Sequence, residues 1–249
     1  MNKKEIVKEY AKNHNYFSLS QIAKETALSK EIVKVYLSHL KREKTVFTAG
    51  HGVYSSIKSV FQLVADNRTY TLLKHLKKNF PYTDFLIWNT RQLQPLYHHT
   101  QQHHITFIDV EKDSVLSFYE IISKEYREAI IEKRSQSYYN SIDIARSPVV
   151  IRNLTSRSSK SKDNHIPRIE KVLGDIFLDI DKYKYISSSD YWNIWKEMYL
   201  RYRIDMGFLY NYVKRRKCLE DIFPKIIYLY RDYRLTFAAY FKKVAKVNS

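Results

Sequence analysis

Glycine is the residue whose scarcity most constrains this chain, because only 4 of its 249 residues are glycine. Two of them, Gly50 and Gly52, lie within three residues of each other. Glycine readily adopts the positive φ that a tight turn requires, so this pair predicts the turn of a β-hairpin with strands over residues 45–48 and 53–57. The chain contains neither GxxxxGK[ST] nor GxGxxG, so we do not expect a glycine-rich loop that cradles a nucleotide phosphate.

Three short helices are predicted before this hairpin. The first, over residues 3–13, carries apolar residues at helical spacing. Ser18 or Ser20 can cap the second, and Ser29 is a suitable N-cap for a third helix over residues 30–43. Three helices followed by a hairpin is the order of a winged helix-turn-helix, so we predict this DNA-binding module at the N-terminus.

The third helix of such a module enters the major groove of DNA. Its stripe of Val33, Tyr36, Leu37 and Leu40 faces inward, which leaves a polar face for the nucleic acid. The expected DNA contacts are Ser29, Lys30, Lys34, Ser38, Lys41 and, at the tip of the wing, His51. The alternative is a winged helix that contacts only protein.

The rest of the chain changes in character. We expect an N-terminal domain over residues 1–58 and a C-terminal domain over residues 59–249. The C-terminal domain would begin with an α/β part (59–154), continue through a basic, serine-rich loop (155–165) and end in a helical part (166–249). Expected strands lie at 61–65, 84–88, 105–110 and 148–151; expected helices lie at 68–80, 114–126, 167–180, 189–203, 206–217 and 219–246. The predicted fold class is therefore α+β, with a winged helix-turn-helix followed by a small α/β domain that ends in a helical bundle.

Charge favours a polyanionic partner, most simply nucleic acid, because 43 basic residues outnumber 26 acidic ones and give a formal net charge of +17. A single cysteine excludes a disulfide scaffold and favours a reducing compartment, for which we expect the cytoplasm. The N-terminal residues lack the apolar region of a signal peptide, and no stretch is long and apolar enough to span a membrane.

Several clusters suggest other chemistry, but we expect no catalytic residue, metal or cofactor. His98, His99, His103 and His104 could ligate zinc, although no cysteine or HExxH pattern accompanies them. An alternative function is a metal-dependent nuclease or other nucleic-acid-modifying enzyme that uses Asp84, Asp109, Glu111 and Lys112, but Glu111 and Lys112 are adjacent and would point to opposite strand faces.

The C-terminal helices carry two further features. Aromatic residues such as Tyr191, Trp192 and Trp195 recur at helical spacing beside arginines, which leaves open a non-enzymatic RNA- or protein-binding adaptor. The run Lys214-Arg215-Arg216-Lys217 precedes Cys218, for which we expect a partly buried, inert thiol. Four consecutive positive charges cannot all be buried, so we expect a solvated or anion-binding surface there.

Four blocks of the chain, in order, resemble the AbiEi-type antitoxins, which are transcriptional regulators of type IV toxin–antitoxin phage-defence operons. The blocks are the predicted winged helix with Gly50-His51-Gly52-Val53-Tyr54, the segment Phe85-Leu86-Ile87-Trp88-Asn89-Thr90 followed by Phe107-Ile108-Asp109-Val110-Glu111-Lys112-Asp113, the helix Pro167-Arg168-Ile169-Glu170-Lys171-Val172-Leu173-Gly174-Asp175, and Leu209-Tyr210-Asn211-Tyr212-Val213-Lys214-Arg215-Arg216. Gly174 and Lys217 depart from the family pattern.

This resemblance implies a non-enzymatic protein with two roles. Its winged helix would bind inverted repeats in the duplex DNA of its own promoter and repress the operon. Its C-terminal domain would counteract a nucleotidyltransferase-like toxin encoded alongside it, and Lys214, Arg215, Arg216 and Lys217 would offer an anion-binding or toxin-antagonising surface.

Overall fold

A computed structural model describes residues 2–97, 101–133, 135–156 and 165–229, which form a mixed α+β fold. These residues divide into two compact units. The first takes in residues up to Phe61 together with those from Glu197 onward, and the second comprises Gln62–Lys196. The expected domains over residues 1–58 and 59–249 stay predictions.

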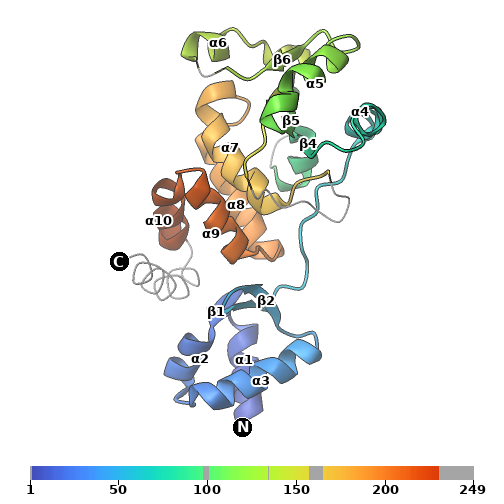
Figure 1. The fold of residues 1–249 in the computed structure, drawn as a ribbon. Coiled ribbons are helices and arrows are strands. Elements are labelled where there is room, and N and C mark those ends of the chain that lie inside the picture. The colour runs from blue at the N-terminus through green and yellow to red at the C-terminus, as the bar shows by residue number, and fades with distance from the viewer. Residues whose placement is uncertain (1, 98–100, 134, 157–164, 230–249) are drawn as a thin grey trace. The chain divides into compact units, whose positions relative to one another are not determined.

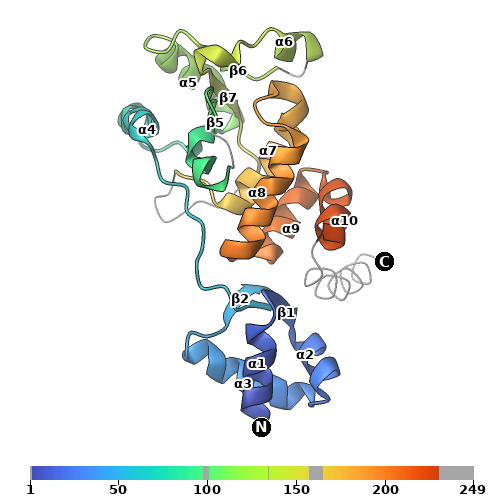
Figure 2. The same ribbon diagram turned by 180° about the vertical axis from the view of Figure 1, so that it is seen from behind.

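The N-terminal part of the first unit combines three helices with a small sheet. Its elements are α1 (Lys3–Lys12), β1 (Tyr16–Ser18), α2 (Leu19–Thr26), α3 (Lys30–Arg42), β2 (Phe47–Gly50) and β3 (Val53–Ser55). The strands form an antiparallel sheet in the order β1-β3-β2, and the three helices gather on one side of it (Figures 1 and 2). The first unit also holds α9 (Met206–Arg215) and α10 (Leu219–Leu229).

Local hydrogen bonds explain where these helices begin. The Asn2 side chain accepts from the Glu5 backbone N–H while the Glu5 carboxylate accepts from the Asn2 backbone N–H, which completes a capping box at α1. Ser18 and Gln21 make the same reciprocal pair at α2. The predicted cap at Ser18 is confirmed, and two otherwise unsatisfied backbone donors are paired at each helix start.

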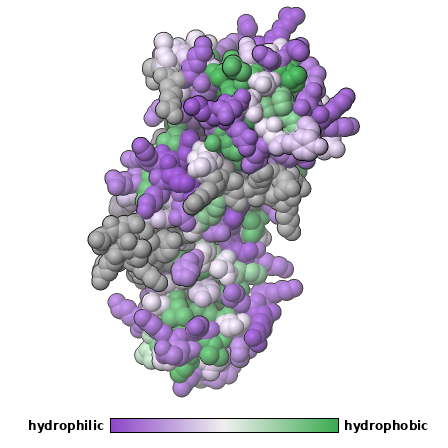
Figure 3. Space-filling view, in the orientation of Figure 1, coloured by the Kyte–Doolittle hydropathy of each residue, from purple (hydrophilic) through white to green (hydrophobic). Residues whose placement is uncertain are grey.

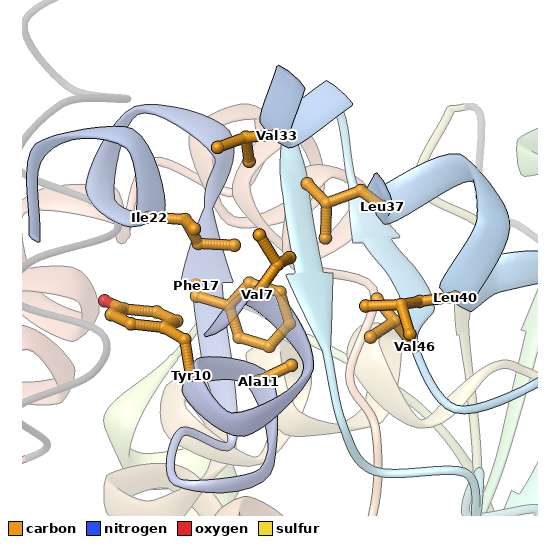
Figure 4. Close-up of a cluster of buried hydrophobic side chains, with 9 residues drawn as sticks. All are labelled: Val7, Tyr10, Ala11, Phe17, Ile22, Val33, Leu37, Leu40 and Val46. Atoms are coloured by element: carbon orange, nitrogen blue, oxygen red, sulfur yellow. The ribbon is translucent and has the colours of Figure 1, made fainter. Parts of the chain in front are cut away.

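The hydrophobic core of this part lies between the helices and the sheet. Figure 4 shows its side chains pointing toward one another. They come from α1, β1, α2, α3 and the segment before β2, and are Val7, Tyr10, Ala11, Phe17, Ile22, Val33, Leu37, Leu40 and Val46. Because α1, α2 and α3 each contribute to the same cluster, burial of these side chains fixes the three helices against one another.

The second unit contains a four-stranded mixed sheet in the order β4-β5-β7-β6. Strand β4 (Phe85–Asn89) is antiparallel to β5 (Thr106–Val110), while β5, β7 (Val149–Asn153) and β6 (Ala129–Ile131) are parallel. The remaining elements are α4 (Asn67–Asn79), η1 (Thr90–Leu96), η2 (Lys112–Ser114), α5 (Val115–Ile122), α6 (Gln136–Asn140), η3 (Ile144–Arg146), α7 (Ile169–Tyr183) and the first part of α8 (Ser188–Arg201).

Helices cover both faces of this sheet. On one face Phe107 of β5 makes an edge contact with Tyr183 of α7, with ring centroids 5.4 Å apart. On the other face Phe85 of β4 packs against Phe118 of α5, at 5.4 Å. Since alternate residues of a strand point to opposite faces, Asp109 lies on the same face as Phe107 and is directed toward α7.

Most expected elements are present within about three residues of their predicted bounds, but two expectations need correction. Residues 61–65 are not a strand: Phe61 and Leu63 are buried, yet no neighbouring strand pairs with this segment. Helix α5 ends at Ile122 rather than near residue 126. The short elements β1, β6 and α6 were not expected. The serine-rich segment beyond Ser156 and the predicted helix beyond Leu229 lie outside the described residues.

No helix in the described part of the chain combines the length and the apolar character needed to cross a membrane.

Candidate nucleic-acid interface

Helix α3 is held in place by its cap and by its buried side. The Ser29 hydroxyl accepts a hydrogen bond from the Ile32 backbone N–H at 3.4 Å. Val33, Leu37 and Leu40 are at most 1% exposed and lie in the core. Because these three residues recur at steps of four and three, they define one side of the helix and leave the opposite side to solvent.

The predicted contact residues of α3 lie on the exposed surface of the helix, along the edge of its buried side, where each lysine is three or four residues from Val33 or Leu37. Lys30, Lys34, Ser38 and Lys41 are all exposed, and their spacing of four, four and three places them in one line along the helix. None of the three lysines forms an ion pair with another described residue. In Figure 3 hydrophilic side chains protrude around the N-terminal part of the molecule, with hydrophobic residues between them. The helix therefore presents three ammonium groups to solvent.

Two other side chains alter the chemistry of this face. Val35 is 52% exposed, one of the large hydrophobic side chains that the fold leaves in solvent. Glu31 lies in the first turn of α3, where hydrogen bonds from its own backbone N–H and from the Ser29 hydroxyl hold its pKa below the ordinary value. The face thus offers an apolar group and a carboxylate as well as cations.

The hairpin tip is in contact with the start of α9. Gly50 has a φ of 134°, and a Cβ at this position would lie 2.8 Å from the backbone nitrogen of Gly207. The glycines predicted a tight turn, and the structure shows that Gly50 also permits this close approach of two backbones. His51, the predicted contact at the tip, has an exposed side chain.

Residues just before α9 hold the small sheet from its other end. The Tyr16 hydroxyl donates to the Tyr202 carbonyl at 3.0 Å and accepts from the Ile204 backbone N–H at 2.9 Å. Arg203 donates to the carbonyls of Ile57 and Lys58 at 3.1 and 3.3 Å. These contacts could not be predicted from the sequence, because they join residues more than 140 positions apart.

The basic run at the end of α9 is only partly exposed. Lys214 and Lys217 are exposed, whereas Arg215 and Arg216 are half-buried. The Arg215 guanidinium lies 5.9 Å from the centre of the Tyr212 ring. Cys218 follows the run and is buried, with its thiol 3.7 Å from the Val213 carbonyl. The solvent-facing charge of this run is therefore carried chiefly by the two lysines.

The four residues considered for a nuclease do not converge. Asp84 is half-buried just before β4, and Asp109 lies within β5 at 2% exposure. Glu111 and Lys112 are exposed beyond the end of β5. Asp109 Oδ1 accepts from Arg152 at 2.5 Å and Asp109 Oδ2 accepts from Lys171 at 2.6 Å. Because cations already bind both of its oxygens, Asp109 belongs to a different arrangement.

That arrangement is a buried ionic network between the sheet and α7. Arg152 of β7 also contacts Asp179 at 2.7 Å and Asp175 at 3.2 Å, and Lys171 contacts Asp175 at 2.5 Å. All five members, Asp109, Arg152, Lys171, Asp175 and Asp179, are at most 5% exposed. The Arg152 guanidinium also lies 4.3 Å from the centre of the Phe107 ring. The network joins two strands to one helix through charge-assisted hydrogen bonds.

The network contains three carboxylates and two cations, and its groups titrate accordingly. Burial disfavours the charge on Arg152, but Asp109, Asp179 and Asp175 raise its pKa well above the ordinary value. Burial raises the pKa of Asp179 despite the nearby Arg152 and Lys182. Lys182 extends the network at its edge, where it contacts Glu132 at 3.2 Å.

Sequence reasoning missed this network, although a signal was present. Lys171, Asp175 and Asp179 recur at intervals of four in a helix whose intervening residues include Val172, Leu173 and Ile176. A line of charges on a helix rich in buried apolar residues indicates buried pairs, because an unpaired charge in that position is very costly.

The histidine cluster does not form a metal site in the part of the chain that the structure describes, where no three His, Cys, Asp or Glu residues are arranged to hold an ion. His98 and His99 lie outside the described residues. His104 is 6% exposed and lies 3.4 Å from the Thr90 hydroxyl, which accepts the Ile105 backbone N–H. Burial and the neighbouring Arg91 lower the pKa of His104 below its ordinary value.

Comparison with known proteins places the chain by family alone. No curated protein and no solved structure matches it. One family model matches residues 32–228, which is most of the chain and includes α3 from Ile32 onward, the ionic network and α9. The chain therefore belongs to a family of unknown function, DUF6577.

Proposed function

We propose that this protein is a DNA-binding regulator in which α3 enters the major groove of duplex DNA. The element order α1-β1-α2-α3-β2-β3 and the three-stranded antiparallel sheet are those expected of a winged helix-turn-helix. Lys30, Lys34 and Lys41 would neutralise phosphates, and Ser38 would bond to the backbone or to a base edge.

The observation that carries this proposal is the composition of the exposed side of α3. A helix surface that contacts only water needs only polar residues, whereas the exposed surface of α3 carries a line of lysines that form no ion pair within the described part of the chain and, on another side, an exposed valine. Among base edges in the major groove, the thymine methyl is the group that an apolar side chain contacts. Val35 would therefore read a thymine, and Glu31 would accept a hydrogen bond from a cytosine amino group.

Helix α3 would make most of the contacts, with a smaller contribution from the hairpin. Because Gly50 lies against Gly207, the hairpin tip is not free to enter a groove along its whole length. The exposed His51 side chain would reach at most a flanking phosphate. This mode of binding concentrates specificity in the first two turns of α3, between Lys30 and Ser38.

The test is the affinity of the full chain for the DNA upstream of its own gene, measured by fluorescence anisotropy over a range of salt concentrations. We expect the substitution Lys34→Ala to weaken binding and to reduce the slope of log K against log salt by about 0.9, the value for one phosphate contact. Lys77→Ala, an exposed lysine of α4 in the other unit, is the matched control and should leave the slope unchanged.

Two results would reject the proposal. The first is binding without preference for the upstream DNA over a scrambled duplex of the same length. The second is a salt slope that Lys34→Ala leaves intact, because the phosphate contacts would then lie elsewhere.

Following its resemblance to AbiEi-type antitoxins, we further propose that the protein represses a toxin–antitoxin operon at inverted repeats in its promoter and counteracts a nucleotidyltransferase-like toxin. The exposed Lys214 and Lys217 support an antagonising surface on α9. Co-expression with the neighbouring open reading frame tests this role. The unaltered chain should relieve growth arrest, and Lys214→Ala with Lys217→Ala should relieve it less while DNA binding is retained. Failure of the unaltered chain to relieve arrest would reject the antitoxin role and leave the DNA-binding role standing.

A further inference from the structure

The first unit contains a groove on which the DNA-binding proposal does not draw. It lies between the last turn of α1, the end of α3 and the start of β2, and has a volume of about 370 Å³. Ligand pockets of roughly 300–1,000 Å³ are usual for small molecules. Its walls come from residues between Lys8 and Lys58, so the groove belongs to a single compact part of the chain.

The rim of this groove is basic. Lys8, Lys12, Lys44 and Lys58 line it, and no acidic residue does. Lys12 has an exposed neighbour, Glu9, at 3.6 Å, whereas Lys8, Lys44 and Lys58 form no ion pair with any other described residue. Ammonium groups that surround one space repel one another, and an anion with more than one negative charge relieves this repulsion.

The floor of the groove is apolar. Ala11, Leu40, Val46 and Phe47 contribute to it. The Arg203 guanidinium stacks on the Phe47 ring, with its carbon 4.6 Å from the ring centre. An occupant that matches both floor and rim therefore has an aromatic or aliphatic body as well as a charged end.

The two hydroxyl groups of the lining already donate their protons to the protein. Thr45 donates to the Leu40 carbonyl at 3.1 Å, and Ser56 donates to the His14 carbonyl at 2.9 Å. Donors for an anion must therefore come from the lysines. Compact ammonium groups on flexible stems suit a phosphate group, which accepts hydrogen bonds from several directions.

The groove is separate from the proposed DNA-reading residues. It adjoins Leu40 in the last turn of α3 and Lys44 just after the helix, whereas Lys30 and Lys34 lie in the first turns; Lys41 follows Leu40 but does not line the groove. At a rise of 1.5 Å per residue, Lys30 and Leu40 are about 15 Å apart along the helix axis. We propose that this groove binds a free organic phosphate of about the size of a nucleoside monophosphate.

The experiment is calorimetric titration of the full chain with three probes: adenosine 5′-monophosphate, adenosine and inorganic phosphate. The monophosphate should bind with one-to-one stoichiometry, and adenosine and inorganic phosphate should each bind at least tenfold more weakly. Lys8→Ala combined with Lys44→Ala should weaken binding of the monophosphate at least tenfold. Lys24→Ala, an exposed lysine on α2 outside the groove, should leave its affinity unchanged, and circular dichroism would verify that each variant is folded.

Three outcomes would overturn the proposal. The first is the absence of monophosphate binding at millimolar concentration. The second is a loss of monophosphate affinity in Lys24→Ala equal to that in the Lys8→Ala, Lys44→Ala variant. Either result would show that the groove has no particular affinity for the monophosphate. The third is displacement of the monophosphate by duplex DNA of random sequence, because the groove would then hold backbone phosphates. Failure of the DNA-binding test leaves this proposal untouched, since the groove shares no residue with the α3 face.

Discussion

Substitution of Lys171 by methionine should strongly destabilise the second unit. The Lys171 ammonium lies 2.6 Å from Asp109 Oδ2 and 2.5 Å from Asp175 Oδ2, with each side chain at most 3% exposed. Methionine keeps most of the volume of the lysine stem but supplies no donor. Three buried carboxylates would then share Arg152 as the one buried cation of the network, and Lys182 at the edge contacts Asp179 at 3.4 Å.

The magnitude follows from the cost of breaking a buried pair. Removing one partner and leaving the other charged typically costs about 3–5 kcal/mol. With an m-value of about 2 kcal/mol/M, the urea midpoint should fall by about 1.5–2.5 M. Tryptophan fluorescence follows this unit selectively, because Trp88, Trp192 and Trp195, the only tryptophans of the chain, all lie in it.

Two further variants make the test specific. Lys74→Met, on the exposed side of α4, should leave the midpoint unchanged. Adding Asp175→Asn to Lys171→Met should restore part of the loss, because it removes one of the carboxylates that compete for Arg152. A urea midpoint for Lys171→Met within about 0.3 M of that of the unaltered chain would refute the reasoning. A double variant that is less stable than the single variant would refute it as well.

Three other predictions address single features. Glu132→Gln should destabilise the protein at pH 7, because Arg152 and Lys182 outweigh the effect of burial and hold the pKa of Glu132 below 4.5. The stabilisation by the Glu132 carboxylate is present above pH 4.5 and is lost as the pH falls through the lowered pKa. Urea unfolding curves of the variant and the unaltered chain should therefore converge in acid, and a constant difference between them would contradict the assignment. Gly50→Ala should lower the free energy of unfolding by about 1–3 kcal/mol, because its Cβ meets the Gly207 backbone. Gly52→Ala, whose Cβ would meet no atom within 4 Å, should lower it by about 1 kcal/mol. Equal losses of stability, measured by far-UV circular dichroism, would show that the close approach of Gly50 to Gly207 is unimportant. Val35→Ala should reduce the preference for one thymine in binding-site selection with the salt slope unchanged; an unaltered preference would exclude Val35 as a base contact.

The elements with strong local signals could be predicted from the sequence. Ser18, Ser29 and the apolar stripe of α3 predicted two helix starts and the buried side correctly, because caps and helical periodicity act over three or four residues. The turn at Gly50 and Gly52 was found for the same reason.

Features that depend on distant partners could not be predicted in this way. Strand β1 has only three residues and exists through its pairing with β3, some forty positions away. Residues 61–65 have the composition of a strand but find no partner. Asp109 was noticed for its charge, but its role depends on Arg152 and Lys171, which the fold brings to it from other elements.

The bonds of the Tyr16 hydroxyl have a consequence for how the protein is made. Ile204 follows Tyr16 by 188 positions, so a ribosome that adds about 5–20 residues per second delivers it about 10–40 s later. Throughout that interval every residue of the second unit is synthesised, while the small N-terminal sheet lacks the carbonyl of Tyr202 and the amide of Ile204. Completion of the N-terminal sheet is thereby tied to synthesis of nearly the whole chain, and a nascent chain released early lacks these two hydrogen bonds.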